Sequence, residues 1–385
     1  MRTAAIVLAA ASALLFAWSY GVYPALIAAL AARPRSAAGS AAPSAPLPSV
    51  DVIVSAADEE SVIGVRIANL LDPEVAGADP PGILVGCDGC RDGTADAARS
   101  AGGARTRVVV VEFPRRRGKA SVVNDLVRTS SADVLVFTDA NTVFEAGALD
   151  ALRRRFEDPA VGAVCGRLEF ETGAGARETP EAAYWDRETR SKEAEGDLGV
   201  CLGANGAIYA ARRELVRPLP EDTTSMDDFL IPARVARAGR RVVFAGDAVA
   251  REDAARDVAA EAARRFRIGI GAGQVLRREL WLWVWPRHAR LTLAFLSRKA
   301  ARWLAPVLGL AAAAAALFVP GLRVVGAAVL AASALLLASA RLRPALGGIA
   351  GRLYYFGVLN VALALGVSAG LVGYSRPAWG RTARA

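Results

Sequence analysis

The tripeptide Asp139-Ala140-Asn141 carries the clearest chemistry in this sequence. It ends an apolar run, Asp133–Thr138, that is typical of a buried strand. In extended chain the side chains of residues i and i+2 point to the same side, so both oxygens can reach one ion. Carboxylate and amide oxygens suit Mg²⁺ or Mn²⁺, which usually share their coordination with substrate phosphates. Asp139 and Asn141 are therefore the candidate metal ligands.

Three further apolar, β-rich runs precede this one. They are Val50–Ser55, Ile83–Cys87 and Arg107–Glu112, and helix-like stretches at Ser61–Leu71 and Lys119–Arg128 separate the runs. Apolar strands alternating with helices predict an α/β fold with a mainly parallel sheet covered on both faces. Ligands of such sheets bind beyond the carboxyl ends of the strands.

Polar side chains follow the predicted strands at those ends. Asp58 and Glu59 follow the first strand and Asp88 follows the second. Lys119 opens the helix after the third strand, where an ammonium and a helix N-terminus suit a phosphate. Taken singly, Asp58 and Asp88 also fit helix or turn caps. Taken together, these side chains predict a pocket at one edge of one sheet.

The hydrophobic residues are gathered in blocks, and the mean hydropathy is +0.30. Nearly uncharged runs cover residues 4–32, 303–319, 324–340 and 353–374. Since a helix needs about 20 apolar residues to cross a bilayer, we expect one N-terminal and about three C-terminal transmembrane helices. The alternatives are a cleaved signal peptide and buried core helices. The first run is about twice the length of a signal-peptide core, which favours a membrane helix.

These blocks predict the domain organisation. We expect an N-terminal transmembrane helix at 1–32, a Pro/Ala/Ser linker at 33–49, a catalytic domain at 50–280, an interfacial segment at 281–302, transmembrane helices at 303–374 and a tail at 375–385. Basic residues after the first helix and before the second place the domain in the cytoplasm. The sequence thus predicts a multi-pass protein of the inner (plasma) membrane. An odd number of C-terminal helices would leave the basic tail outside, against that rule.

Charge and cysteine content narrow the function classes. The net charge is +9, but many arginines lie between 251 and 302, where an anionic leaflet or a diphosphate accounts for them. No nucleic-acid motif accompanies them, so we expect no nucleic-acid partner.

Cys87 and Cys90 have the spacing of a zinc or redox pair. With a single histidine, His288, near the membrane, buried free thiols are the favoured interpretation for all four cysteines.

In the order and spacing of its motifs, the chain resembles membrane-bound glycosyltransferases of family 2, related to cellulose, chitin and hyaluronan synthases, which have a GT-A fold. Ser55–Glu60 is similar to their first-strand loop, Asp88–Thr94 to their Asp-Gly-Ser-x-Asp-Gly-Thr segment, and Arg117–Ala120 with Asn124 to their Gly-Lys…Asn stretch. The resemblance implies a nucleotide-sugar donor and Mg²⁺ or Mn²⁺ at Asp139 and Asn141. The donor contacts it implies are Ala57, Asp58, Glu59, Asp88, Lys119, Asp139, Ala140 and Arg264.

The resemblance continues through the second half of the domain. Gly203–Arg213 is similar to the acceptor-side segment, which implies acceptor contacts at Gly203, Asn205 and Gly206. Asp227-Asp228 matches the Thr-Glu-Asp motif, which implies that Asp228 is the catalytic base, with Asp227 beside it. Without the resemblance, the same pair fits an exposed helix N-terminus.

A last motif, Arg264–Ile268, stands where membrane synthases carry Gln-x-x-Arg-Trp, which implies that Arg267 joins the catalytic group. Arg264 in place of Gln and Ile268 in place of Trp depart from the pattern of processive synthases, so transfer of one or a few sugars stays open.

The function implied is inverting transfer to a lipid-linked or glycan acceptor, in cell-envelope or extracellular polysaccharide synthesis. The alternatives are a polyprenyl-phosphate sugar synthase, a nucleotidyltransferase and a non-catalytic membrane scaffold. A transporter finds no support, because the apolar runs contain no acidic residue.

Overall fold

A computed structural model describes residues 1–32, 47–77, 79–103, 107–171, 180–253, 258–284, 289–340 and 348–376. The chain divides into two compact units. One comprises Ala28–Ala254 and is called the sheet unit below; the other combines Met1–Ile27 with Ala255–Arg376 and is called the helical unit. Most of the predicted linker, residues 285–288 of the interfacial segment and most of the predicted tail lie outside the described residues.

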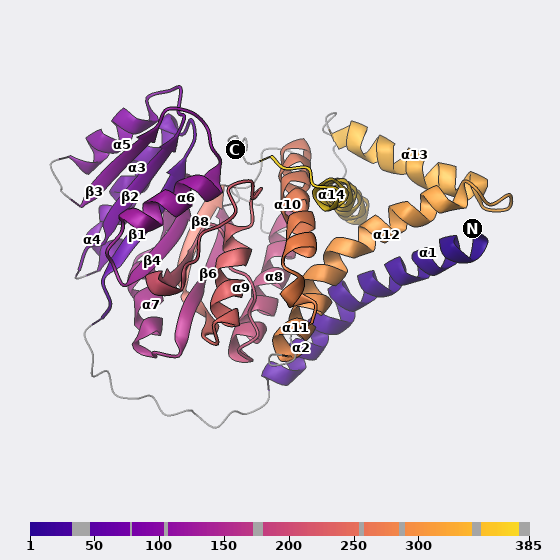
Figure 1. The fold of residues 1–385 in the computed structure, drawn as a ribbon, viewed down its shortest axis with the longest axis horizontal. Coiled ribbons are helices and arrows are strands. Elements are labelled where there is room, and N and C mark those ends of the chain that lie inside the picture. The colour runs from indigo at the N-terminus through magenta and orange to yellow at the C-terminus, as the bar shows by residue number, and fades with distance from the viewer. Residues whose placement is uncertain are drawn as a thin grey trace. The chain divides into compact units, whose positions relative to one another are not determined.

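The sheet unit is built on eight strands in the described residues, in the order β3-β2-β1-β4-β7-β6-β8-β5. The first four are mutually parallel: β1 (Val50–Ala56) pairs with β2 (Gly82–Asp88) and β4 (Val134–Asp139), and β2 pairs with β3 (Val108–Phe113). These strands confirm all four runs predicted from the sequence. Their carboxyl ends, with Asp88 and Asp139, lie at one edge of the sheet (Figure 1).

The other half of the sheet is mixed. The strand β7 (Tyr209–Arg212) is antiparallel to β4 and to β6 (Val161–Glu171). The long strand β8 (Arg241–Asp253) runs parallel to β6, and the short β5 (Val143–Phe144) is antiparallel to β8. The expectation of a mainly parallel sheet therefore holds only for the first half. Strand direction is decided by which neighbour a strand pairs with, and the composition of the strand does not encode that choice.

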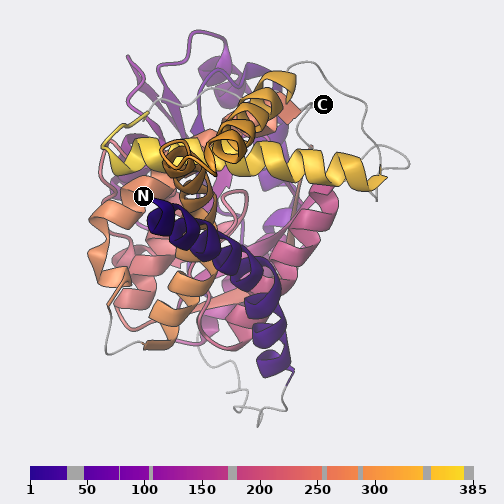
Figure 2. The same cartoon turned by 90° about the vertical axis from the view of Figure 1, so that its right-hand side faces the viewer.

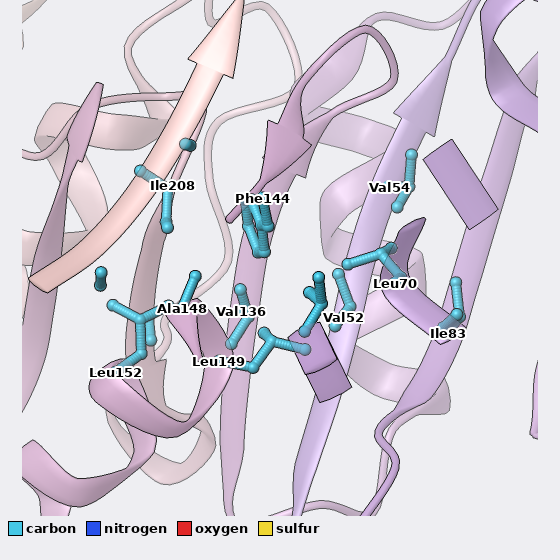
Figure 3. Packing of buried hydrophobic residues seen from close by; sticks show 14 of the residues in the cluster. Val52, Val54, Leu70, Ile83, Val136, Phe144, Ala148, Leu149, Leu152 and Ile208 are labelled. Atoms are coloured by element: carbon cyan, nitrogen blue, oxygen red, sulfur yellow. The ribbon is translucent and has the colours of Figure 1, made fainter. Parts of the chain in front are cut away.

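Helices cover both faces of this sheet. On one face, α3 (Glu60–Leu71), α5 (Thr94–Gly102) and α7 (Ala148–Arg154) enclose the main apolar core. Figure 3 shows Leu70, Leu149 and Leu152 packed against strand residues such as Val52 and Val136. The opposite face carries α6 (Lys119–Thr129) and α9 (Asp227–Arg237). The remaining helices of the sheet unit are α4 (Pro73–Ala76), η2 (Arg155–Glu157), α8 (Pro180–Asp197) and η4 (Arg213–Leu215).

The helical unit begins with one continuous helix made of α1 (Arg2–Ala17), a π-helical turn η1 (Trp18–Val22) and the start of α2 (Tyr23–Ala31). Its other members are α10 (Val258–Arg278), η5 (Leu280–Leu282), α11 (Ala289–Ala294), η7 (Phe295–Ala300), α12 (Ala301–Ala316), α13 (Arg323–Ser339) and α14 (Gly348–Leu371).

Among the described residues, two helices are long and apolar enough to cross a bilayer, at Arg2–Ala31 and Ile349–Leu371. The other two predicted spans fold as α12 and α13, of 16 and 17 residues. At 1.5 Å per residue α13 falls short of a hydrocarbon layer of about 30 Å, whereas α12 continues α11 and η7 without a break. Two of the four expected transmembrane helices thus have the required length and composition, and the number of membrane spans stays a prediction.

The helices α10 and α14 are in close contact through glycine, and Figure 2 shows α14 in yellow along its length. Gly269 and Gly273 of α10 face Gly366 and Gly370 of α14, and their Cα atoms are next to one another. A Cβ at Gly269 would lie 2.6 Å from the carbonyl oxygen of Leu363. Two small residues spaced by four let helix backbones approach in this way, which is a common contact between membrane helices.

Candidate active site

Three elements of the sheet unit bring charged side chains together at the carboxyl edge of the parallel strands. Asp139 is the last residue of β4, Lys119 is the first of α6, and Asp227 is the first of α9. The ammonium Nζ of Lys119 lies 2.9 Å from Oδ1 of Asp139 and 3.3 Å from Oδ2 of Asp227. One cation thus bridges two carboxylates that are 88 residues apart in sequence.

Gly206 marks the point on which the site converges. A Cβ placed on Gly206 would lie 3.7 Å from Oδ2 of Asp228 and 3.8 Å from Oδ2 of Asp139. The residue predicted to bind the metal and the residue predicted to act as base therefore face the same small region. A side chain at position 206 would project into that region, so glycine keeps it open.

Lys119 stays an ammonium in this setting. Burial alone would lower the pKa of Lys119, but the carboxylates of Asp139 and Asp227 outweigh burial and raise it above the ordinary value for lysine. The site therefore offers a fixed positive charge beside the acids.

Asp227 is also held by Tyr209, a residue that the sequence analysis missed. The buried hydroxyl of Tyr209 donates to Oδ2 of Asp227 at 3.0 Å, and its ring stacks on Phe137 at 4.7 Å. Burial raises the pKa of Tyr209, and Asp227 and Asp228 raise it further, so the phenol keeps its proton. With Lys119 and Tyr209 on Asp227, the half-buried Asp228 is the member of the pair closer to the open region.

The backbone before α9 is strained where it presents these acids. Ser225 and Met226 have φ values of 44° and 151°, which residues other than glycine rarely adopt. Such strain clusters at functional sites, where the surrounding structure supports it. Here the carbonyl oxygen of Asp228 accepts from the amide of Ala204 at 2.8 Å, which ties the start of α9 to the predicted acceptor segment.

The residues at the end of β4 fit a divalent cation. Asn141 lies in a turn after β4 and not in extended chain, so strand alternation is not what places it. Its buried Nδ2 has no hydrogen-bond partner in the described part of the chain. An amide whose nitrogen has no partner can be turned to present its oxygen, and that oxygen with the carboxylate of Asp139, two residues earlier in the chain, would make the donor set that Mg²⁺ and Mn²⁺ prefer.

Among the residues predicted to bind the nucleotide, Asp88 is fully buried, and its carboxylate accepts hydrogen bonds from the protein backbone. Its Oδ1 accepts from the amide of Arg117 at 2.8 Å and its Oδ2 from the amide of Gly118 at 2.9 Å. These bonds fix the turn that leads into Lys119. Asp88 thereby positions Lys119, and a direct contact of Asp88 with the nucleotide stays a prediction.

The loop after β1 forms its own polar cluster. Asp58, with a positive φ of 58°, accepts from the amide of Arg91 at 2.8 Å and pairs with the side chain of Arg116. Glu59 donates its amide to Thr94 at 2.8 Å, and Ala57 is buried beside them. These residues lie at the same edge of the sheet; their donor contacts stay predictions, as does that of Ala140.

The acceptor segment is anchored by a second residue missed in the sequence, Lys192 of α8. Its buried ammonium donates to the carbonyl of Ala204 at 2.9 Å and to the side chain of Asn205, whose Nδ2 donates to Gly166 at 2.7 Å. Both ends of the Asn205 amide are therefore used inside the protein. Acceptor binding at Gly203, Asn205 and Gly206 stays a prediction.

Arg264 and Arg267 lie on α10 in the helical unit. Arg264 and Arg265 pair with the buried Glu261 at 3.4 Å and 2.9 Å. Burial lowers the pKa of Arg267, and the nearby charges of Arg264 and Arg376 lower it further. The roles proposed for Arg264 and Arg267 stay predictions. The four cysteines are free thiols, and three of them are buried.

Comparison with known proteins gives this geometry a context. Residues 48–271 match the family described as "Glycosyltransferase like family 2". An N-acetylglucosaminyltransferase of Rhizobium leguminosarum bv. trifolii is 33% identical over 129 residues, which cover 32% of this chain and 68% of the relative. The N-acetylglucosaminyltransferase of R. leguminosarum bv. viciae is 27% identical over 45% of this chain. The chain spans only 41% of the length of that second relative.

Among solved structures, a mannosyltransferase of Pyrobaculum calidifontis, determined in complex with GDP-Man and Mn²⁺, has a similar fold. It is 25% identical with a TM-score of 0.64, and the match covers 94% of this chain and 99% of the mannosyltransferase. The match therefore extends over both the sheet unit and the helical unit.

Proposed function

The chain belongs to glycosyltransferase family 2, and from this premise we propose that it is an inverting enzyme that transfers a sugar from a nucleotide-sugar donor to a lipid-linked or glycan acceptor. The observation that carries the proposal is the convergence of Asp139 and Asp228 on Gly206, with the ammonium of Lys119 paired to Asp139 and to Asp227, the neighbour of Asp228. A base and a cation-binding acid that border one small region suit attack on a sugar whose leaving group is a diphosphate.

In this proposal Asp228 accepts the proton of the acceptor hydroxyl as the hydroxyl oxygen bonds to the anomeric carbon. The bond between that carbon and the diphosphate oxygen breaks, and nucleoside diphosphate leaves. General-base assistance of this kind contributes roughly 10²–10⁴ in rate. Lys119 lies where its ammonium can stabilise the charge that gathers on the leaving diphosphate. Tyr209 orients Asp227, which keeps the Lys119 side chain directed into the site.

A divalent cation held by Asp139 and Asn141 would supply charge neutralisation at the same diphosphate. The P. calidifontis enzyme, whose structure contains Mn²⁺ and GDP-Man, supports this assignment by its similar fold. We expect Mg²⁺ or Mn²⁺ to serve here.

The helical unit supports a membrane location. Two of its helices are long and apolar enough to span a bilayer. Large apolar side chains are also exposed on its surface, among them Leu14, Val324, Leu335, Ile349 and Leu353. Exposed apolar side chains on long apolar helices suit contact with lipid. We therefore place the protein in the inner membrane as a multi-pass protein, with the sheet unit on the cytoplasmic side where nucleotide sugars are made, acting in cell-envelope or extracellular polysaccharide synthesis.

The test is nucleoside diphosphate release from a panel of nucleotide sugars, in membrane vesicles that contain the full chain. UDP-N-acetylglucosamine and GDP-mannose come first, because relatives are named N-acetylglucosaminyltransferases and a structural neighbour is a mannosyltransferase in complex with GDP-Man. We expect release that requires Mn²⁺ or Mg²⁺ and that is lost in Asp139→Ala. The matched control is Asp133→Ala, because Asp133 flanks the other end of β4 and bonds to Ser49.

Three results would redirect the assignment. Release of pyrophosphate would identify a nucleotidyltransferase. Label recovered in an acid-labile lipid would identify a polyprenyl-phosphate sugar synthase. An Asp139→Ala enzyme that Mn²⁺ still stimulates would place the cation elsewhere.

A further inference from the structure

A buried arginine lies behind the loop that carries the candidate metal ligands. Arg66 of α3 is 1% exposed, and its guanidinium lies 4.0 Å from the centre of the Phe144 ring. It donates to Oδ1 of Asn69 at 2.7 Å and to Oγ1 of Thr138 at 2.9 Å. Thr138 directly precedes Asp139, so one hydrogen bond of Arg66 reaches the residue next to the first metal ligand.

The other side of the loop is held from the same helix. Asn69 accepts from the amide of Phe144 at 2.8 Å and donates to the carbonyl of Phe144 at 2.9 Å. Phe144 lies three residues after Asn141, in β5. Arg66 and Asn69 thus fix both ends of the segment 139–143, which is too short to adjust independently of its ends.

A third contact extends the network toward the predicted acceptor segment. The hydroxyl of Thr138 accepts from Arg66 and donates to the carbonyl of Ala207 at 2.7 Å. Ala207 directly follows Gly206, on which Asp139 and Asp228 converge. Within the loop itself, Thr142 donates to the buried Glu252 at 2.7 Å. The hydrogen bonds therefore connect the metal side of the site to the acceptor side.

Burying the charge of Arg66 costs free energy that an apolar side chain at the same position would not cost. Burial lowers the pKa of the guanidinium to about 9, while Glu252 and Asp139 act in the opposite direction, so it stays charged near neutral pH. An apolar residue of similar volume in place of a buried ion is often neutral or stabilising. The advantage of an arginine at this position is that its planar guanidinium directs two separate N–H donors at fixed angles.

We propose that Arg66 is a positioning residue that sets Asp139 and Asn141 relative to the Gly206 segment. The inference rests on the proposed function, since it takes Asp139 and Asn141 as the cation ligands. Arg66 itself contacts neither substrate nor cation; it acts through Thr138 and Asn69.

The experiment measures Mn²⁺ affinity by electron paramagnetic resonance on the purified full chain, together with kcat and donor KM. We expect Arg66→Met to weaken Mn²⁺ binding at least tenfold. Arg66→Lys should not restore it, because one ammonium cannot replace the two directed donors. Thr138→Val, which leaves the charge in place and removes only the hydroxyl, should weaken binding in the same direction. The matched control is Arg153→Met: Arg153 is another buried arginine of the sheet unit, and it bonds to Pro48 and Asp79 instead.

The outcomes separate this inference from the proposed function. Wild-type Mn²⁺ affinity in folded Arg66→Met and Thr138→Val proteins would overturn the inference, and Thr138→Val decides alone if Arg66→Met does not fold. Equal weakening in Arg153→Met would overturn it too, by showing a general effect of destabilisation. Retained Mn²⁺ affinity in Asp139→Ala would instead refute the cation site of the proposed function.

Discussion

A close contact inside each of the two units shows a different way of packing, with charged side chains in the sheet unit and glycine in the helical unit. In the sheet unit, charged groups at the edge of the sheet are bonded to one another, as in the half-buried Lys119 with Asp139 and the buried Asp227. In the helical unit, α10 and α14 meet backbone to backbone at Gly269 and Gly366. The first arrangement depends on directed hydrogen bonds and the second on the absence of side chains.

Because the two contacts differ in chemistry, different substitutions should destabilise them. A polar network fixes atoms to within a fraction of an ångström, which a reaction needs, but it leaves unsatisfied groups when one partner is removed. A glycine contact fixes only the distance between two helices, and it can form in apolar surroundings where few polar side chains are present to hydrogen-bond between helices. We therefore expect the sheet unit to be sensitive to isosteric changes in polarity, and the helical unit to be sensitive to added volume.

The largest effect should come from Asp228→Asn, an isosteric change of polarity. Loss of the base should lower kcat by roughly 10²–10⁴, while binding of the nucleotide sugar stays near the wild-type value. Turnover by nucleoside diphosphate release and donor binding by calorimetry check this. The control is Asp96→Asn, an exposed acid in the first turn of α5. A tenth of the wild-type turnover in Asp228→Asn would exclude Asp228 as the base.

A smaller effect is expected from Tyr209→Phe, which removes a hydrogen bond to a carboxylate and leaves the ring stacked on Phe137. Hydrogen bonds to charged groups contribute about 1.5–3 kcal/mol, so the free energy of unfolding should fall by that amount. Denaturant unfolding of the full chain measures this free energy.

Because the folded protein raises the pKa of Tyr209, the folded protein binds more protons than the unfolded chain above the ordinary tyrosine pKa near 10.

The stability contributed by Tyr209 should thus be complete below about pH 10 and decline as the pH rises above it. In Tyr209→Phe that decline should be shallower, and Lys119, whose pKa is also raised, should account for part of the decline that remains. An identical pH slope in both proteins would mean that Tyr209 is not buried against Asp227.

The helical unit should respond to one added methyl group. In Gly269→Ala the new Cβ would lie 2.6 Å from the carbonyl of Leu363 and 2.9 Å from Cα of Gly366, and neither backbone atom can move independently of α14. Overpacking of this kind costs about 1–3 kcal/mol. Thermal unfolding in detergent should show a lower midpoint. An unchanged midpoint would mean that α10 and α14 are not packed through glycine.

The smallest effect, of opposite sign, is expected from the same substitution in the sheet unit. Gly64 lies within α3, and a Cβ there would meet nothing within 4 Å. Gly64→Ala should stabilise the protein by about 0.5–1 kcal/mol, because alanine loses less conformational entropy than glycine in a helix. Measured beside Gly269→Ala, it separates the cost of the close contact from the intrinsic preference of alanine for helix. Destabilisation in both variants would remove the contrast between the units.

Much of the fold followed from local pattern. The four apolar runs became β1 to β4 within one or two residues of the predicted bounds, and Lys119 begins α6 as expected. Two of the predicted spans proved to be helices of 16 and 17 residues, because hydropathy marks an apolar run but not where the helix within it ends. Tyr209, Lys192 and Arg66 were missed because nothing in their local sequence signals a partner, and each one bonds to a residue from a different element.

The alternation of strands and helices, the acids and the lysine at the strand ends, and the blocks of apolar residues can all be read from the amino-acid sequence, since neighbours along the chain set them. Three features become visible only in the folded protein: Asp139 and Asp228 face one glycine, Asp88 accepts hydrogen bonds from the turn before Lys119, and α10 packs on α14. Those facts depend on contacts between residues far apart in sequence, and their geometry is fixed by packing and hydrogen bonding in three dimensions.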